Sequence, residues 1–153
     1  MTVNPAEPKA AAYPGPPAVH GALAKHTGFL LSRMGLVAQK RFSEHLEQLG
    51  LTTRMWGALN VLDAEGSITQ HALGRCTGID PSSMVATIDE LEKRGLVERR
   101  AHALHVTENG HETLARGRKL ARHAQEELLA PLSADERRQL HDLLLRLAVA
   151  SDH

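Results

Sequence analysis

Histidine and glutamate side chains are the first groups in this chain to consider for chemistry. The 153 residues include ten histidines, and Glu44 and His45 are adjacent, while His105 and His111 follow further along. Imidazole and carboxylate groups are zinc ligands, so these four residues raise the hypothesis of a zinc-responsive protein. A structural zinc site needs a closed set of four ligands, whereas these histidines are scattered. We therefore expect no metal site and no other cofactor.

The single cysteine, Cys76, excludes an intramolecular disulfide and any zinc site made mainly of cysteines. A redox role would need a reactive thiol, but Cys76 is expected on the inner face of a short helix with Ala72 and Leu73, where a thiol behaves as a small apolar group. The sequence contains no nucleophile motif, phosphate-binding glycine loop or paired carboxylates. We therefore do not expect an enzyme.

A different chemistry is offered by the segment from Pro81 to Asp89, which is rich in small and hydroxyl side chains. If Met84, Ile88 and Leu91 form the buried face of a helix, six residues face outward: Pro81, Ser82, Ser83, Val85, Ala86 and Asp89. Small residues let a helix approach base edges in the major groove, where serine hydroxyls donate or accept hydrogen bonds. The alternative is that both serines are only first-turn helix formers.

Trp56 is the candidate for a ligand contact, because its flat ring suits an aromatic molecule and its N–H needs a partner when buried. His26 and Arg33 are candidate polar companions. The alternative is that Trp56 belongs to the hydrophobic core.

Two short helices must position the outward face of Pro81–Asp89. The first follows Thr69, an N-cap residue, and ends in a tight link that contains Gly78. Asp80 caps the second helix, which begins at Pro81 and ends near Arg94. Two short helices joined by a glycine turn predict a helix-turn-helix.

The remaining segments are also mainly helical. Five of the seven prolines fall in residues 1–18, which predicts an extended arm. Apolar periodicity and capping residues predict further helices, and strand-like segments lie between them. These segments are helices at about 19–50, 53–64, 108–129 and from Ser133 onward, and strands at about 96–100 and 102–106.

The composition sets limits on the class of protein. Aromatic residues make up only 3% of the chain, so Leu, Val, Met and Ala must fill the core, which favours helices over a β-sandwich. The 18 basic and 18 acidic residues balance, so the net charge gives no argument for nucleic acid. We expect a cytoplasmic protein, because the sequence has neither a long apolar run nor a signal-peptide pattern.

Three segments resemble the MarR (multiple antibiotic resistance regulator) family. Residues 91–99, Leu-Glu-Lys-Arg-Gly-Leu-Val-Glu-Arg, look like the end of its recognition helix and its first wing strand. Residues 106–110, Val-Thr-Glu-Asn-Gly, resemble its second wing strand and the next helix start, and residues 51–56, Leu-Thr-Thr-Arg-Met-Trp, resemble the start of its second helix. The resemblance runs from about Leu23 to the C-terminus, and the order of elements agrees.

The resemblance implies a mainly α fold with a small β-hairpin wing, a winged helix-turn-helix with dimerisation helices at both ends. The implied parts are an arm (1–18), an N-terminal dimerisation helix (19–50), a DNA-binding lobe (51–107) and C-terminal dimerisation helices (108–153). The implied function is a homodimeric transcriptional regulator that binds near-palindromic double-stranded DNA. Such a regulator typically acts as a repressor and releases DNA when it binds a small aromatic or phenolic ligand.

The resemblance also implies roles for particular residues. The residues that would face bases are Pro81, Ser82, Ser83, Val85, Ala86 and Asp89. Thr69 and Gln70, at a helix N-terminus, would face phosphate, and Arg99 and Arg100 would belong to the wing. Some members of the family bind zinc through two histidines one helical turn apart, but here Thr107 stands where the partner of His111 would lie.

The wing departs from the family pattern. The family commonly has a charged turn of the form Asp-x-Arg-Arg between its wing strands, whereas here Arg100 runs directly into Ala101. Residues 96–106 contain no Gly, Asn, Asp or Pro, which short turns favour. We therefore expect that the residues of a wing tip are missing between about Arg99 and His102. The alternative is a natural deletion that leaves a tight link.

The charges of residues 66–107 also balance, with five basic and five acidic side chains. DNA affinity depends on neutralising phosphates, so this balance keeps a second function open. In that alternative, the protein is a helix-turn-helix dimer that serves as a protein-interaction module.

Overall fold

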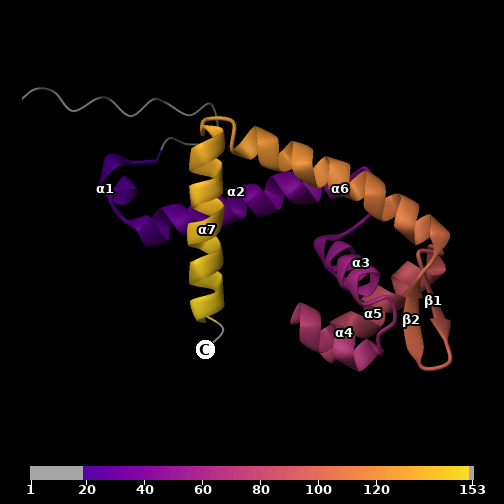
Figure 1. Cartoon of the computed structure of the whole chain (residues 1–153). Coiled ribbons are helices and arrows are strands. Elements are labelled where there is room, and N and C mark those ends of the chain that lie inside the picture. The colour runs from indigo at the N-terminus through magenta and orange to yellow at the C-terminus, as the bar shows by residue number, and fades with distance from the viewer. Residues whose placement is uncertain (1–18, 152–153) are drawn as a thin grey trace, which may run out of the picture. The chain divides into compact units, whose positions relative to one another are not determined.

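The computed structural model describes residues 19–151, so the arm expected at 1–18 lies outside the described residues. The chain forms two compact units, which divide between Leu36 and Val37 inside helix α2. The described elements are α1 (Gly21–Ala24), α2 (Thr27–Glu47), α3 (Thr53–Glu65), α4 (Gln70–Thr77), α5 (Pro81–Lys93), β1 (Val97–Arg100), β2 (Ala103–Val106), α6 (Glu108–Leu128) and α7 (Ala134–Ser151) (Figure 1). Within residues 19–151, no helix combines the length and apolar character that crossing a membrane requires.

The expected mainly α fold with one antiparallel hairpin is confirmed. The single helix expected over about 19–50 is wrong, because the chain turns at Lys25 and His26 between α1 and α2. The His20 side chain caps α1 by accepting a hydrogen bond from the backbone N–H of Ala22 at 3.2 Å. Gly28, in the first turn of α2, lowers the helix propensity beside the break.

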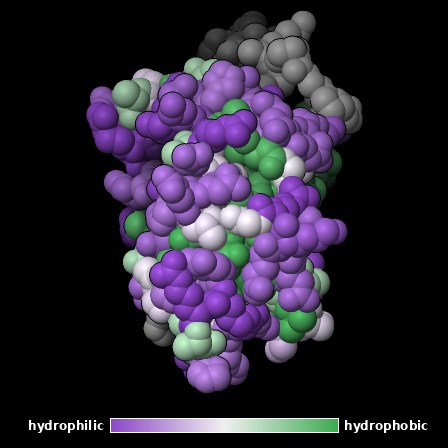
Figure 2. Space-filling view, turned by 90° about the vertical axis from the view of Figure 1, so that its right-hand side faces the viewer, coloured by the Kyte–Doolittle hydropathy of each residue, from purple (hydrophilic) through white to green (hydrophobic). Residues whose placement is uncertain are grey.

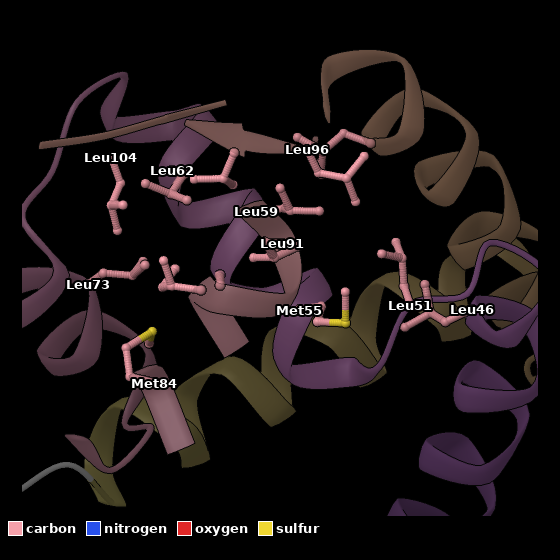
Figure 3. Close-up of a cluster of buried hydrophobic side chains, with 14 residues drawn as sticks. Leu46, Leu51, Met55, Leu59, Leu62, Leu73, Met84, Leu91, Leu96 and Leu104 are labelled. Atoms are coloured by element: carbon pink, nitrogen blue, oxygen red, sulfur yellow. The ribbon is translucent and has the colours of Figure 1, made fainter. Parts of the chain in front are cut away.

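A lobe formed by α3, α4, α5 and the β1–β2 hairpin contains most of the hydrophobic core, as Figure 3 shows. Leu59 and Leu62 of α3, Leu91 of α5 and Leu104 of β2 are fully buried and point toward one another. Burying a leucine side chain contributes roughly 1.5–3 kcal/mol, so these contacts fix how the two helices and the hairpin pack. Leucine and methionine rather than aromatic residues fill this core, as the composition predicts.

Helix α4 buries only Leu73, and Cys76 is exposed. The expectation that Cys76 lies on an inner face is therefore wrong. The helix has only eight residues and buries a narrow face, so its last turn leaves the thiol in solvent.

Helix α6 is anchored to the lobe at its N-cap residue. Thr107 caps it by accepting a hydrogen bond from the backbone N–H of Gly110 at 3.0 Å, and the same hydroxyl donates to the Gly95 carbonyl at 2.6 Å. The capping box expected at Ser133 is confirmed: the Ser133 N–H donates to the Glu136 carboxylate at 2.7 Å, and the Glu136 N–H donates to the Ser133 hydroxyl at 3.3 Å. It opens α7.

Large apolar side chains are exposed in both units. On α7, the exposed set is Leu143, Leu144, Leu145, Leu147 and Val149. In the N-terminal unit, it is Leu23, Leu30, Leu31, Met34 and Leu36. The face shown in Figure 2 is mainly hydrophilic, with hydrophobic patches between polar residues. Exposed apolar surface of this extent is typical of a protein that associates with a partner.

The wing hairpin closes with a turn of only two residues. Arg100 pairs with Ala103, and the antiparallel register continues to Val97 and Val106. Among the described residues other than glycine, only Ala101 has a positive φ, at 52°. The expectation that the hairpin needs further residues here is therefore wrong, since alanine adopts the left-handed angle at a cost. A two-residue turn with positive φ at its first position normally has glycine there.

We predict that Ala101→Gly stabilises the protein by about 0.5–1 kcal/mol. The left-handed conformation costs an L-residue roughly 1–2 kcal/mol, and glycine loses part of this gain through the entropy of the unfolded chain. Urea denaturation measures the difference. The matched control is His102→Gly, where φ is not positive and only the entropic loss applies, so its midpoint should fall. A lower midpoint for Ala101→Gly would contradict the strain.

Candidate nucleic-acid interface

The turn between α4 and α5 is built by local hydrogen bonds. Gly78 ends α4 in the left-handed conformation at φ 67°, which glycine adopts without steric cost. The Thr77 hydroxyl donates to the Leu73 carbonyl at 2.9 Å, so the last turn of α4 stays closed. Isolated bridge pairing joins Ile68, just before α4, to Leu104 in β2, with the Leu104 N–H donating to the Ile68 carbonyl at 2.9 Å.

Asp80 is the N-cap of α5. Its carboxylate accepts hydrogen bonds from the Ser83 backbone N–H at 2.9 Å and from the Ser82 hydroxyl at 2.8 Å. The hydrogen bonds from Ser83, and then the one from Ser82, hold the pKa of the Asp80 carboxyl well below its usual range. The carboxylate is therefore ionised at neutral pH. Because the Ser82 proton is directed to Asp80, this hydroxyl presents its lone pairs outward and can accept a hydrogen bond from a base amino group.

The two faces of α5 differ in burial. The inner face consists of Met84, Thr87, Ile88 and Leu91, all buried. Thr87, the buried polar residue of this face, donates its hydroxyl proton to the Ser83 carbonyl at 2.7 Å. On the outward face Pro81, Ser82, Val85, Ala86 and Asp89 are exposed, and Ser83 is half-buried. The helix thus presents a narrow row of small side chains to solvent.

Thr69 and Gln70, expected to face phosphate, lie at the N-terminus of α4. The Thr69 hydroxyl accepts a hydrogen bond from the Ala72 N–H at 3.2 Å, which satisfies one backbone donor of the first turn. Gln70 is half-buried, and its side-chain oxygen accepts a hydrogen bond from Arg99 at 3.1 Å. The amide of Gln70 therefore positions a wing arginine.

Both wing arginines contact acidic residues. Arg99 donates to the Glu92 carboxylate at 3.1 Å as well as to Gln70, so it joins β1 to both helices of the helix-turn-helix. Arg100 pairs with Glu98 of its own strand. The balance of charge seen in the sequence is thus local at the wing, since Arg99 and Arg100 each have an acidic neighbour.

Trp56 lies on α3 and is half-buried. Its ring meets Phe42 edge to face, with ring centroids 5.8 Å apart and planes inclined by 75°. A Cβ atom at Gly117 of α6 would overlap the Trp56 ring, at 2.9 Å from Cε3, so a glycine is required for α6 to pass this closely. The indole thus has a packing role between α2 and α6.

The two proposed companions of Trp56 belong to the other unit. His26 is exposed in the link between α1 and α2, and Arg33 is half-buried on α2. Trp56 lies in the unit that begins at Val37.

The four residues behind the zinc hypothesis do not come together as one set. Glu44 forms an ion pair along its own helix. Nδ1 of His111 lies 3.0 Å from the Asp63 carboxylate, and His105 is half-buried in β2. Only His45 belongs to the group of ligand-type side chains found among residues 19–151.

Sequence reasoning missed the other members of that group, His123 and Glu127 on α6. The available signal was their four-residue spacing on a long helix, which puts both side chains on one face. Their nearness to His45 depends on how α2 packs against α6 and has no local signal.

The Asp63 side chain of α3 contacts two residues of α6. Its carboxylate lies 2.6 Å from the Arg118 guanidinium and 3.0 Å from the His111 ring. The hydrogen bond from Arg118 is the largest cause that lowers the pKa of the Asp63 carboxyl. The charged pair ties the middle of α6 to the lobe.

Comparison with known proteins gives a consistent result. The profile of the MarR family matches residues 49–105. A protein of Thauera aromatica, described as a candidate transcriptional regulatory protein for the hcr operon, is 33% identical over 137 residues, which cover 84% of this chain and 82% of that protein.

Solved structures agree with this match. The MarR family protein Rv2887 of Mycobacterium tuberculosis, in complex with DNA, is 29% identical with a TM-score of 0.75, over 80% of this chain and 97% of that chain. The transcriptional repressor CouR, bound to p-coumaroyl-CoA, is 33% identical with a TM-score of 0.72, over 84% of this chain and 95% of that chain.

We predict that Gly117→Ala destabilises the protein by about 1–3 kcal/mol, because the added methyl group forces the Trp56 ring to move in a packed contact. The ring is the only tryptophan, so its fluorescence maximum should shift in the same variant. The control is Gly57→Ala on α3, where no atom lies within 4 Å of the added Cβ. There the higher helix propensity of alanine should raise the urea midpoint. Equal gains in both variants would show that α6 does not need Gly117.

Proposed function

The chain belongs to the MarR family of transcription regulators, and we propose that it is a homodimeric, ligand-responsive repressor that reads DNA with α5. The observation that carries the proposal is the outward row of small residues on α5, held in place by a buried inner face. Small side chains allow the close approach that direct contacts in the major groove require. A regulator of this kind works on chromosomal DNA, so we infer a cytoplasmic location and no enzymatic activity.

We assign three roles along the described chain. Residues 51–107 bind DNA. The residues that approach the bases are Pro81, Ser82, Ser83, Val85, Ala86 and Asp89. The residues that contact the sugar-phosphate backbone of the DNA are Thr69, Gln70, Arg99 and Arg100. Residues 19–50 and 108–151 form the dimer. The exposed leucines of α7 support this assignment, because a second copy would remove them from water.

The paired wing arginines favour a modest electrostatic contribution to binding. Each ion pair with Glu92 or Glu98 offsets the charge available to phosphate. Affinity should then depend on base contacts more than on counterion release, and the slope of log affinity against log salt should be shallow. If the protein does not bind DNA even at low salt, where binding is strongest, the protein-interaction module would be favoured instead.

We predict that Ser82→Glu weakens binding to the selected site by at least about 100-fold. A carboxylate at the groove repels phosphate and loses the serine contact, a cost of several kcal/mol. The site is first selected from random duplexes, and it should be a near-palindrome with half-sites spaced by roughly 10 bp.

The matched control for this experiment is Ala115→Glu, which adds the same charge at an exposed position of α6. Sedimentation should give a dimer for the wild type and both variants. Equal affinity of Ser82→Glu and Ala115→Glu would mean that α5 does not read the DNA.

We further infer that a small aromatic or phenolic acid binds beside Trp56. The half-buried indole offers an aromatic face to such a ligand. A ligand shifts the protein off DNA only if it binds the DNA-competent and DNA-incompetent conformations with different affinity.

We predict that salicylate or 4-hydroxycinnamate weakens DNA binding by roughly 5- to 150-fold, the usual range of coupling between two sites. By reciprocity, the selected DNA should weaken binding of the same acid by the same factor. Trp56 fluorescence reports acid binding directly, because the chain has no other tryptophan. If neither acid alters either equilibrium, the assignment of the ligand class is wrong.

A further inference from the structure

Three side chains from two helices converge away from α5 and the wing. His45 of α2 and His123 and Glu127 of α6 each bring one ligand-type atom within 4.8 Å of the other two. The Glu127 carboxylate lies between the rings, 3.7 Å from His45 Nε2 and 3.2 Å from His123 Nε2. From this arrangement we propose a binding site for a divalent transition metal of the zinc class, held by these three residues.

The hydrogen bonding of His45 carries the proposal furthest. Its Nδ1 lies 2.7 Å from the Arg41 carbonyl, which can only accept, so Nδ1 bears the proton. In the neutral ring, Nε2 then carries a lone pair, and this atom faces the carboxylate of Glu127. Two acceptors face each other stably only with a cation between them, either a second ring proton or a metal ion. A backbone carbonyl behind the imidazole is also the usual support of a metal-binding histidine.

The spacing of the three groups suits a small ion. Two ligand atoms at about 2.1 Å from a tetrahedral centre lie about 3.4 Å apart. The two nitrogen–oxygen distances, which run to different oxygens of the Glu127 carboxylate, bracket this value, and all three ligand atoms lie within 4.8 Å of one another. His123 and Glu127 are one turn apart on α6, which keeps both on the same face.

Burial gives the site a fixed wall and an open side. The side chain of His45 is 16% exposed, whereas those of His123 and Glu127 are 60% and 46% exposed. An ion can enter from solvent and meet an imidazole that is already oriented. Three protein ligands leave one tetrahedral position for water, and two imidazoles favour zinc, nickel or copper over magnesium or calcium.

The expected consequence of binding is a clamp between α2 and α6. His45 adjoins Leu46, which is fully buried in the core, so the ion would join the core-packed end of α2 to α6. This inference concerns metal binding alone and does not rest on the proposed DNA or acid binding. It replaces the expectation from the sequence that the chain has no metal site.

The test is a Zn²⁺ titration of the full chain in competition with a chromogenic chelator at pH 7.5. One ion per chain should bind, and His123→Gln and Glu127→Gln should each weaken binding by more than about 100-fold, beyond the effect of losing a supporting group. Glu126→Gln and His141→Gln are the controls, since both residues are exposed and outside the cluster.

Co²⁺ provides an independent signal, because its visible absorption reports coordination by nitrogen and oxygen ligands. The band should form in the wild type and in both controls, and should be lost in Glu127→Gln. Glu127→Gln replaces the carboxylate by a neutral amide of nearly the same size. It therefore still tests metal coordination if His123→Gln disturbs the fold, which the helical circular dichroism would show. The proposal would be overturned if the wild type did not bind the metal, or if His123→Gln and Glu127→Gln bound it as tightly as the wild type. The three residues would then be only an ion-paired cluster.

Discussion

The packing of α5 against α3 and the hairpin is the contact on which the rest of the structure depends. Four of the thirteen residues of α5 are buried, among them Ile88 and Leu91, and they meet Leu59 and Leu62 of α3 and Leu104 of β2. This contact fixes the rotation of α5 about its axis and therefore decides which side chains face outward. A residue on the inner face that changed size would lower stability and alter the orientation of the outward face as well.

The charges around the wing limit how strongly the lobe can attract phosphate. The wing arginines are held by Glu92, Glu98 and Gln70, which orients them and also offsets their charge. The guanidinium of Arg99 connects β1 with α4 and α5, so it keeps the wing in place beside the helix-turn-helix. In this lobe the wing is oriented without excess positive charge, which agrees with our proposal that specificity comes from close fit to the bases.

Much of the fold was predictable because its signals are local. The helix starts at Thr69, Asp80, Thr107 and Ser133 follow from capping residues that contact the backbone three positions on. The outward row of α5 followed from helical periodicity for the same reason. The break at His26, the exposure of Cys76 and the left-handed Ala101 were not predicted. Each depends either on a small difference in backbone energy or on tertiary packing, and neither leaves a signal in the local sequence. The cluster of His45, His123 and Glu127 joins residues nearly eighty positions apart, and only tertiary packing brings them together.

Helix α6 receives these contacts in order along its length. At its start, Thr107 is bonded to Gly95 beside the hairpin. In its middle, Gly117 lies against Trp56, and Arg118 is paired with Asp63 of α3. Toward its end, Glu127 and His123 meet His45 of α2.

A single rigid helix therefore carries the wing, the indole and the histidine cluster. A ligand at either of the last two positions can act on the wing only by favouring one placement of α6 over another. The tight passage at Gly117 makes that placement sensitive, because a packed contact without spare volume shifts between discrete arrangements and does not deform gradually. We therefore expect any control of DNA binding by such a ligand to depend on where α6 lies against α3.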